Sequence, residues 1–311
     1  MVDFSDIDRD GMPDMLFYRD SAVYTFFNKY SSNSASDTNL CRTALETSVL
    51  AASPMFTKFA QSATDPQHVI KQTIYFGTEK VVSLVEGGLG VPGRLHVADI
   101  DADGYPDLLL TGMVTRDQKE ISQSALFMNS QPQISSDVPI KPNGISKDSK
   151  REFVEQTSDY SLKDLALTSS SVGHFVDIDE DGRIDMLLQR KTSEHTDLLC
   201  IYNNYVKDAF FLKALMVNTL DEYGNGLTGA NYRIIVTDLN DQKFVVTGSQ
   251  LTQNSYNSLQ MPYAYLGVGR SNNYVETFTA AYSIQGERSI RVWTPIIPNS
   301  QLIIFAPEMD T

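Results

Sequence analysis

The stretch that decides the fold is HVADIDADGYPDLLLTG, at residues 96–112. It aligns without gaps with two other stretches, DFSDIDRDGMPDMLFY at residues 3–18 and HFVDIDEDGRIDMLLQR at residues 174–190. All three contain the pattern D-x-D-x-D-G-x-x-D and continue directly into a short apolar run. Because self-similarity within one chain is the signature of a repeat architecture, we interpret the three stretches as copies of one structural unit.

The spacing within each unit is typical of a loop that binds Ca²⁺. Calcium takes six to eight oxygen ligands, and carboxylates at positions 1, 3 and 5 converge when the chain coils tightly. Glycine at position 6 permits the sharp turn, because it adopts a positive φ at low cost. We expect the carbonyl of position 7 and the carboxylate of position 9 to complete each ligand set, around about three structural Ca²⁺ ions in all. The predicted ligands are Asp6, Asp8, Asp10, Met12 and Asp14 in the first loop, Asp99, Asp101, Asp103, Tyr105 and Asp107 in the second, and Asp177, Asp179, Asp181, Arg183 and Asp185 in the third.

The EF-hand is the obvious alternative for this spacing. It requires a bidentate Glu at position 12 and a helix on each side of the loop. Position 12 is Phe17, Leu110 or Leu188, and the runs that follow the loops are short and apolar, as in buried strands. We therefore expect each loop to join two strands of one hairpin.

Composition and charge limit the remaining possibilities. The 311 residues are 41 % hydrophobic and carry a formal net charge of −14, most of it in the three loops. A nucleic-acid binder needs a basic face, so we expect no nucleic-acid partner. Closely packed carboxylates repel one another without a cation, which favours filled metal sites over acidic solvated turns. No apolar run of about 18 residues is present, and the N-terminus does not have the pattern of a signal peptide.

The last hundred residues alternate strand-like runs with turn signals. The runs are AFFLKALMV, YRIIVTD, KFVVTG, YAYLGVG, YVETFTAAY, SIRVW and QLIIFA. Their number and spacing predict a β-sandwich of about 100 residues. We expect Trp293, the sole tryptophan, to be a core or domain-contact residue.

No catalytic motif is recognisable, so we predict that the chain is not an enzyme. His96 and His174 occupy the same position of the repeat, which favours a structural role over a catalytic one. Cys200 lies in the strand-like run LLCIYNNY and is interpreted as a buried small hydrophobe.

The loop followed by a strand resembles the FG-GAP/VCBS repeat of integrin α-subunit propellers, in which each repeat is one blade. The resemblance implies an all-β fold with about three blades of a partial β-propeller at residues 1–206, and these blades would be part of a larger propeller. The second blade would use GRLHVAD, DLLLTG, SALFMN and REFVEQ, and the third HFVD, DMLLQ and DLLCIYNNY. The first blade would use DMLFYRD and AVYTFFNKY, with a loop-like insertion at residues 30–70.

The segment at residues 207–311 is similar to a UnbV/ASPIC-like β-sandwich domain. Its strings DAFFLKA, LQMPYAYLGVGRSNNYVE and WTPIIPNSQLII, joined to the FG-GAP loops, resemble the T-cell immunomodulatory protein family, also called Linkin. That family has a signal peptide, further repeats and one transmembrane helix, so the resemblance implies that this chain is a fragment.

The resemblance implies a calcium-stabilised, integrin-α-like binding or adhesion protein, the ectodomain of a single-pass membrane protein on the cell surface or the lumenal side. Its partner would be an unidentified protein, and it would meet the membrane only through an anchor absent from this chain. The alternative is an intracellular scaffold subunit that uses the same propeller for protein–protein contacts.

Overall fold

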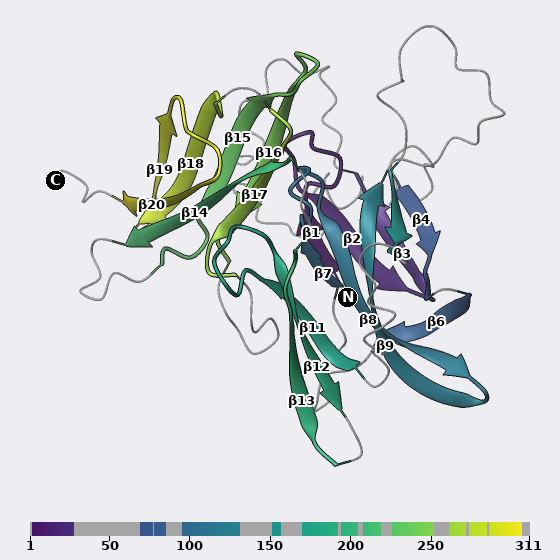
Figure 1. Ribbon diagram of the computed structural model, residues 1–311. Helices are drawn as coiled ribbons and strands as arrows, with labels where there is room; N and C mark the ends of the chain where they lie inside the picture. Colours follow the sequence, from purple (N-terminus) through teal and green to yellow (C-terminus); the bar gives the residue numbers. More distant parts are fainter. Residues whose placement is uncertain are drawn as a thin grey trace, which may run out of the picture.

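The computed structural model is all-β, with twenty strands and no helix among the residues that it describes. The described residues are 2–27, 69–76, 78–84, 95–130, 151–156, 170–191, 194–204, 208–218, 226–251, 261–271, 274–284 and 286–306. Within these ranges, nothing forms a helix of the length and hydropathy needed to cross a bilayer. The predicted fold class, blades of a partial propeller followed by a β-sandwich, is confirmed (Figure 1).

The first blade is an antiparallel sheet in the order β1-β2-β3-β4. Its strands are β1 (Val2–Ser5), β2 (Asp14–Arg19), β3 (Ala22–Phe26) and β4 (Val69–Thr73). The first Asp loop joins β1 to β2, as predicted for a loop within one hairpin. The expected loop-like insertion falls almost wholly on residues 28–68, which lie outside the described residues.

The second blade is built around the long strand β8. The strands of its sheet are β5 (Tyr75–Phe76), β6 (Glu79–Leu84), β7 (Leu95–Ala98), β8 (Asp107–Arg116), β9 (Lys119–Ser130) and β10 (Glu152–Glu155). The first half of β8 pairs with β7 and its second half with β6, while β9 pairs along its whole length. The run VIKQTIYF is therefore divided, because β4 completes the first blade whereas β5 and β6 extend the second.

The third blade has three described strands, β11 (Ser170–Val176), β12 (Asp185–Lys191) and β13 (Thr196–Ile201). Within the described ranges β13 is an edge strand, paired on one side with β12. Leu198 and Cys200 on the outer face of β13, and Tyr202 directly after it, are exposed. The prediction that Cys200 is buried is wrong, because only the inner face of this strand packs against another blade.

The core of the blades lies on both sides of β8. Leu108 and Leu110 pack with Leu16 of the first blade, whereas Leu109 points the opposite way and packs with Leu188 of the third. All of these side chains are fully buried. Successive residues of a strand point to opposite faces, so an unbroken leucine run is what a strand covered on both faces requires.

The C-terminal part is a sandwich of two sheets, in the orders β17-β14-β20 and β16-β15-β18-β19. Its strands are β14 (Phe210–Asn218), β15 (Asn231–Thr237), β16 (Lys243–Ser249), β17 (Ala264–Gly269), β18 (Thr277–Ile284), β19 (Glu287–Trp293) and β20 (Ser300–Ala306). The proposed domain boundary at 206–207 falls between β13 and β14 and stays a prediction.

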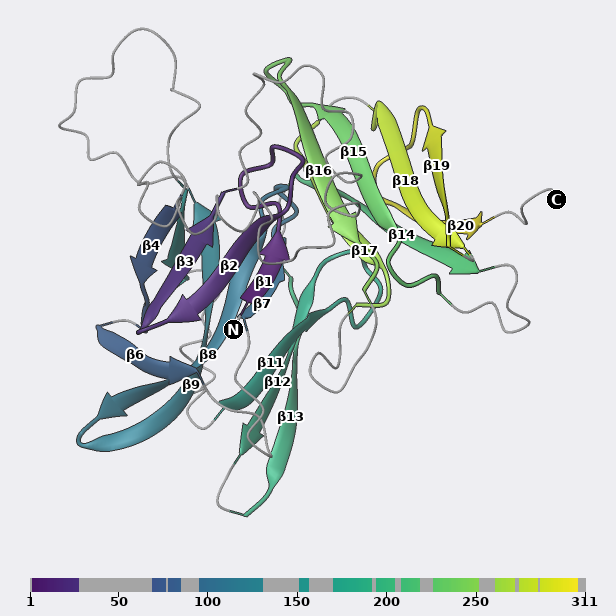
Figure 2. The same ribbon diagram turned by 180° about the vertical axis from the view of Figure 1, so that it is seen from behind.

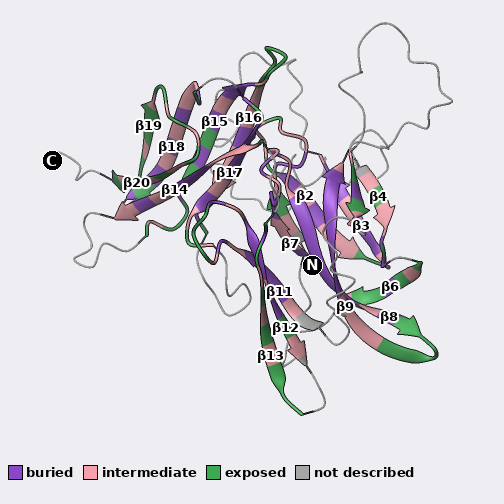
Figure 3. Ribbon diagram, viewed as in Figure 1, coloured by how far each residue is buried: buried purple, intermediate pink, exposed green. Residues whose placement is uncertain are grey.

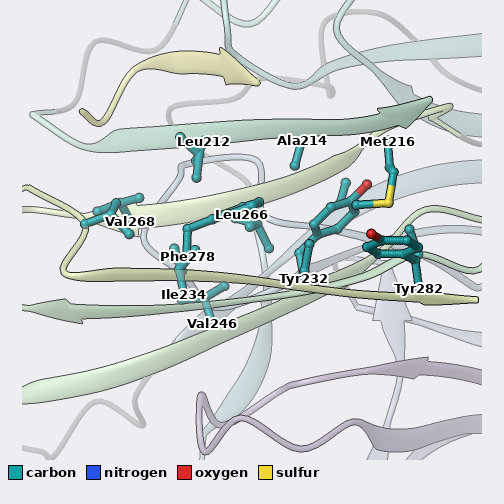
Figure 4. Packing of buried hydrophobic residues seen from close by; sticks show 14 of the residues in the cluster. Leu212, Ala214, Met216, Tyr232, Ile234, Val246, Leu266, Val268, Phe278 and Tyr282 are labelled. Atoms are coloured by element: carbon teal, nitrogen blue, oxygen red, sulfur yellow. The ribbon is translucent and has the colours of Figure 1, made fainter. Parts of the chain in front are cut away.

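The two sheets enclose an apolar core. Figure 4 shows Leu212, Leu266, Ile234, Val246 and Phe278 reaching into it from both sheets. Trp293 packs on this core, with its ring centroid 5.6 Å from that of Phe278. The prediction of a structural role for the sole tryptophan agrees with this position.

The sandwich lies against the end of the blades that carries the Asp loops (Figures 1 and 2). The hairpin ends of β8 and β9, and the start of β13, lie away from it and are exposed (Figure 3). The first aspartate of each loop (Asp6, Asp99 and Asp177) is buried where the blades meet the sandwich, whereas Asp10, Asp179 and Asp181 are exposed to solvent.

Candidate metal centres

The three Asp loops share one backbone conformation. Each has left-handed residues at positions 4 and 6, where the chain reverses between its two strands. The φ angles are 60° at Arg9, 56° at Ala102 and 59° at Glu180, and 89° at Gly11, 87° at Gly104 and 91° at Gly182. Glycine at position 6 answers this requirement, because a Cβ is disfavoured at positive φ.

The aspartate at position 1 closes the turn from within. Its Oδ2 accepts a hydrogen bond from the backbone N–H of the glycine at position 6 in every loop. The donor–acceptor distances are 2.9 Å for Gly11 and Asp6, 2.7 Å for Gly104 and Asp99, and 3.0 Å for Gly182 and Asp177. The shared pattern fixes one carboxylate at the centre of each loop.

The aspartate at position 9 holds the loop to its own blade. Its Oδ2 accepts the backbone N–H of the isoleucine at position 2 in all three loops. These distances are 2.8 Å from Ile7 to Asp14, 2.9 Å from Ile100 to Asp107 and 2.8 Å from Ile178 to Asp185. The aspartate therefore has a structural task besides the ligand role predicted for it.

Aspartate oxygens converge in each loop at a spacing that fits one ion. One ligand atom from each of three carboxylates lies within 4.8 Å of the other two. The groups are Asp6, Asp8 and Asp10, then Asp99, Asp101 and Asp107, then Asp177, Asp179 and Asp185. Two oxygens bound to the same Ca²⁺ at about 2.3–2.6 Å lie at most about 5 Å apart, so this spacing fits calcium.

The other predicted ligands stand outside these groups. They are the aspartates Asp14, Asp103 and Asp181; the position-7 residues Met12, Tyr105 and Arg183 would bind through backbone carbonyls, which these carboxylate groups do not include. Each position-7 residue uses its backbone N–H to donate to the carboxylate at position 5, at 2.8–2.9 Å. Their carbonyl ligand role stays a prediction.

Burial makes the negative charge of these loops costly. It raises the pKa of Asp6 to about 7, with a further increase from the carboxylates of Asp10 and Asp8. Burial, followed by repulsion from neighbouring carboxylates, also raises the pKa of Asp99 and of Asp107 well above the ordinary range. A bound cation reverses this effect, because it favours the ionised form of each ligand.

One buried oxygen points to a further partner. Oδ1 of Asp177 is buried and accepts no hydrogen bond from the described residues. A buried carboxylate oxygen of this kind needs compensation by a donor or a cation. At Asp177 the compensating cation is either a metal ion or a charged side chain, and the donor sets and their spacing in the loops fit calcium.

Two asparagines that the sequence analysis missed connect the loops of neighbouring blades. The backbone N–H of Asn129 donates to Asp107 Oδ1 at 2.9 Å, and its side-chain Nδ2 donates to the carbonyl of Ile7 in the first loop at 3.0 Å. Asn203 repeats this arrangement one blade further on, with a bond of 2.9 Å from its Nδ2 to the carbonyl of Ile100. The recurring signal was an Asn near the end of the strand that pairs with the strand after the Asp loop: Asn129 is the penultimate residue of β9, and Asn203 follows the end of β13 by two residues.

The first aspartate of each loop also meets one strand of the sandwich. Thr247 of β16 donates its hydroxyl to Asp6 Oδ2 at 3.3 Å. Gly267 of β17 lies so close to Asp99 that a Cβ there would be 1.7 Å from Oδ2. Lys213 of β14 contacts Asp177 Oδ2 with its ammonium group. The residues at the candidate metal centres are thus also the residues of the contact between the two bodies.

Arg9 strengthens this contact at position 4 of the first loop. Its guanidinium donates to the carbonyl of Asp103 in the second loop at 2.8 Å. It also lies 3.5 Å from the ring centroid of Phe244 in β16 and 4.5 Å from that of Tyr105. Partial burial lowers the pKa of Arg9, and the neighbouring Tyr105 and Asp103 oppose this shift.

The histidines of the repeat meet each other rather than a substrate site. The ring centroids of His96 and His174 are 4.5 Å apart in an edge-to-face arrangement between the second and third blades. This contact agrees with the structural role predicted from their repeated position.

The fold and the loops together define a class of protein, in which Asp-loop propeller blades carry a β-sandwich at their loop-bearing end. The family described as "ITFG1, C2 domain" matches residues 222–311, so the sandwich is similar to a C2 domain; the matched range begins after β14. The sequence resemblance had instead been to a UnbV/ASPIC-like domain.

Relatives that align over more of the chain than the C2-domain match identify the family. The chain is 31 % identical over 229 residues to the T-cell immunomodulatory protein of Macaca fascicularis, covering 69 % of each chain. It is also 31 % identical over 229 residues to the human T-cell immunomodulatory protein, covering 69 % of this chain and 35 % of the human one. Protein linkin of Caenorhabditis elegans is 24 % identical over 227 residues, with 68 % and 36 % covered. The chain belongs to the T-cell immunomodulatory protein family, and it spans about a third of the length of the human and nematode relatives.

Proposed function

We propose that this chain is part of a calcium-stabilised, non-catalytic binding protein of the cell exterior. In this proposal calcium held by the Asp loops is structural, and it stiffens the junction between the blades and the sandwich. The observation that carries the proposal is the position of the first aspartate of each loop, which lies in the candidate ion group and touches the sandwich.

The negative charge at this junction is what a bound calcium ion would neutralise. Buried carboxylates raise the free energy of the folded state when nothing neutralises them. An ion that binds the folded chain and not the unfolded one stabilises it by mass action, by about 2.7 kcal/mol at a concentration 100 times its Kd. Calcium would therefore hold the loops and the sandwich in one arrangement.

Two considerations support an exterior location and a protein partner: the family to which the chain belongs, and the availability of free calcium. Relatives named T-cell immunomodulatory protein and linkin give the family, and Asp-rich loops suit the higher free calcium outside cells. We propose that the blades bind a protein ligand. The repeated aspartates support a binding role over a catalytic one, since all three loops share one backbone conformation.

Thermal unfolding of the metal-stripped chain tests the calcium proposal. Adding Ca²⁺ is expected to raise the melting temperature measured by circular dichroism, and excess EDTA to reverse the rise. Asp101→Asn is expected to reduce the rise, whereas Asp20→Asn makes the same charge change at an exposed residue outside the loops and is expected to preserve it. A melting curve that calcium leaves unchanged contradicts the proposal.

Surface labelling of intact cells tests the location. A full-length gene product tagged next to the sandwich is expected to react with an impermeant biotin reagent without permeabilisation. Labelling that requires permeabilisation supports the intracellular scaffold instead.

A further inference from the structure

The three sandwich strands that meet the loops offer three different chemistries to the first aspartates. Thr247 offers a neutral hydroxyl to the first loop, and Gly267 offers no side chain to the second. Lys213 offers an ammonium group to the third loop. The first aspartate is held alike in all three loops, so the difference between these three partners arises from the sandwich; the loops themselves differ at position 4, which is Arg9, Ala102 or Glu180.

Lys213 is withdrawn from water together with its partner. Its side chain is 5 % exposed and that of Asp177 is 0 % exposed. The Lys213 ammonium contacts Asp177 Oδ2 and lies 5.0 Å from the ring centroid of Tyr263. A buried ammonium is stable only when it is paired, so this contact is a requirement of the fold rather than a chance surface pair.

The strand that carries Lys213 holds it in this place. Leu212 and Ala214, on either side of it, are fully buried in the sandwich core. Because adjacent residues of a strand point to opposite faces, anchoring these neighbours directs Lys213 out of the sandwich and into the third loop. Withdrawal of the ammonium would require the sandwich to separate from the loop.

We propose that Lys213 supplies the cation of the third loop, so that this loop is closed by an ion pair between the two bodies and calcium occupies only the first two loops. The inference rests on the proposed calcium function. A divalent ion among Asp177, Asp179 and Asp185 would lie beside the ammonium group, and like charges at this separation repel strongly away from water. The third loop has a group of three aspartates like the other loops, but the Lys213 ammonium already neutralises part of their negative charge.

Calcium stoichiometry of the whole, metal-stripped chain tests this inference by titration calorimetry. The unaltered chain is expected to bind about two ions. Lys213→Met is expected to raise the number to about three, because it removes the ammonium and keeps an apolar stem of similar length. Lys243→Met is the matched control, since Lys243 is an exposed lysine of β16 that pairs with Glu276, and it is expected to leave about two.

A second pair of variants keeps the test valid if Lys213→Met does not fold. Asp101→Ala and Asp179→Ala remove the aspartate at position 3 of the second and third loops. The inference predicts that Asp101→Ala lowers the stoichiometry to about one and that Asp179→Ala leaves it at about two.

Two outcomes overturn the inference, and they are distinguishable. About three ions in the unaltered chain, falling to about two in both Asp101→Ala and Asp179→Ala, would mean that the third loop holds calcium despite Lys213. No binding in the unaltered chain or in any variant would contradict the calcium proposal itself.

Discussion

Substitution of Gly182 by alanine isolates the contact between the third loop and the sandwich. A Cβ at Gly182 would lie 2.0 Å from Cζ and 2.2 Å from Cε1 of Phe211, on β14. The Phe211 ring cannot easily move away, because it stacks on Tyr265 at a centroid distance of 5.8 Å. The hydroxyl of Tyr265 in turn donates to the carbonyl of Gly182 at 2.9 Å.

The expected cost has two parts, and a matched control separates them. Gly182 and Gly286 have nearly the same backbone conformation, with φ of 91° and 87°, but a Cβ at Gly286 would meet nothing within 4 Å. Placing alanine in a left-handed conformation costs about 1–2 kcal/mol at either position. Overpacking typically adds about 1–3 kcal/mol, and only at Gly182. We therefore expect Gly182→Ala to lower the free energy of unfolding by about 1–3 kcal/mol more than Gly286→Ala.

Urea unfolding supplies the assay. Circular dichroism follows all the sheets, and the fluorescence of Trp293 follows the sandwich alone. Adding Phe211→Ala to Gly182→Ala is expected to relieve the overpacking, with a coupling energy of about 1–3 kcal/mol in the double-mutant cycle. Equal destabilisation by Gly182→Ala and Gly286→Ala, together with no coupling to Phe211, would refute the contact.

Three further results are expected. Asn203→Ala removes the donor to the carbonyls of Ile100 and Ile184, at 2.9 and 3.1 Å, and should lower the free energy of unfolding in urea by about 1–3 kcal/mol; a change within about 0.5 kcal/mol speaks against the link between blades. The pKa of Asp6 is raised from its ordinary value of 3.8, which applies to the unfolded chain, to about 7 in the folded chain. Folding therefore takes up a proton at pH values between about 4 and 7. The melting temperature of the metal-free chain should therefore fall as pH rises from about 4 to 7, and the calcium-induced rise should grow over the same range; a metal-free melting temperature that climbs with pH contradicts the buried charge. Cys200 is exposed on β13, so its thiol should react with an aromatic disulfide reagent in the native chain. A Cys200 thiol that reacts only after unfolding would contradict this exposure.

The parts of the fold that depend on short stretches of sequence were predictable. The pattern D-x-D-x-D-G-x-x-D fixes its own turn through hydrogen bonds between residues at most seven positions apart. The runs that follow it form the second strand of each hairpin, as the unbroken leucines at residues 108–110 indicated. Alternating apolar residues likewise identified the strands of the sandwich.

The features that depend on distant packing were not predictable. Nothing in the run AFFLKALMV indicates that Lys213 is buried. Its contact with Asp177 depends on how the sandwich packs against the blades. Asn129 and Asn203 act across blades, on carbonyls 122 and 103 residues away in the chain. Cys200 was misplaced because a strand of apolar residues does not reveal which of its faces another blade covers.

The central claim is that calcium in the Asp loops holds the sandwich against the blades, and hydrogen–deuterium exchange tests it most directly. EDTA is expected to increase amide exchange in the first and second loops and also in β16 and β17, which carry Thr247 and Gly267. Exchange in β18, which lies within the sandwich sheet and away from the loops, is expected to stay the same. Unchanged exchange in β16 and β17 on chelation, with calcium demonstrably removed, would contradict the claim.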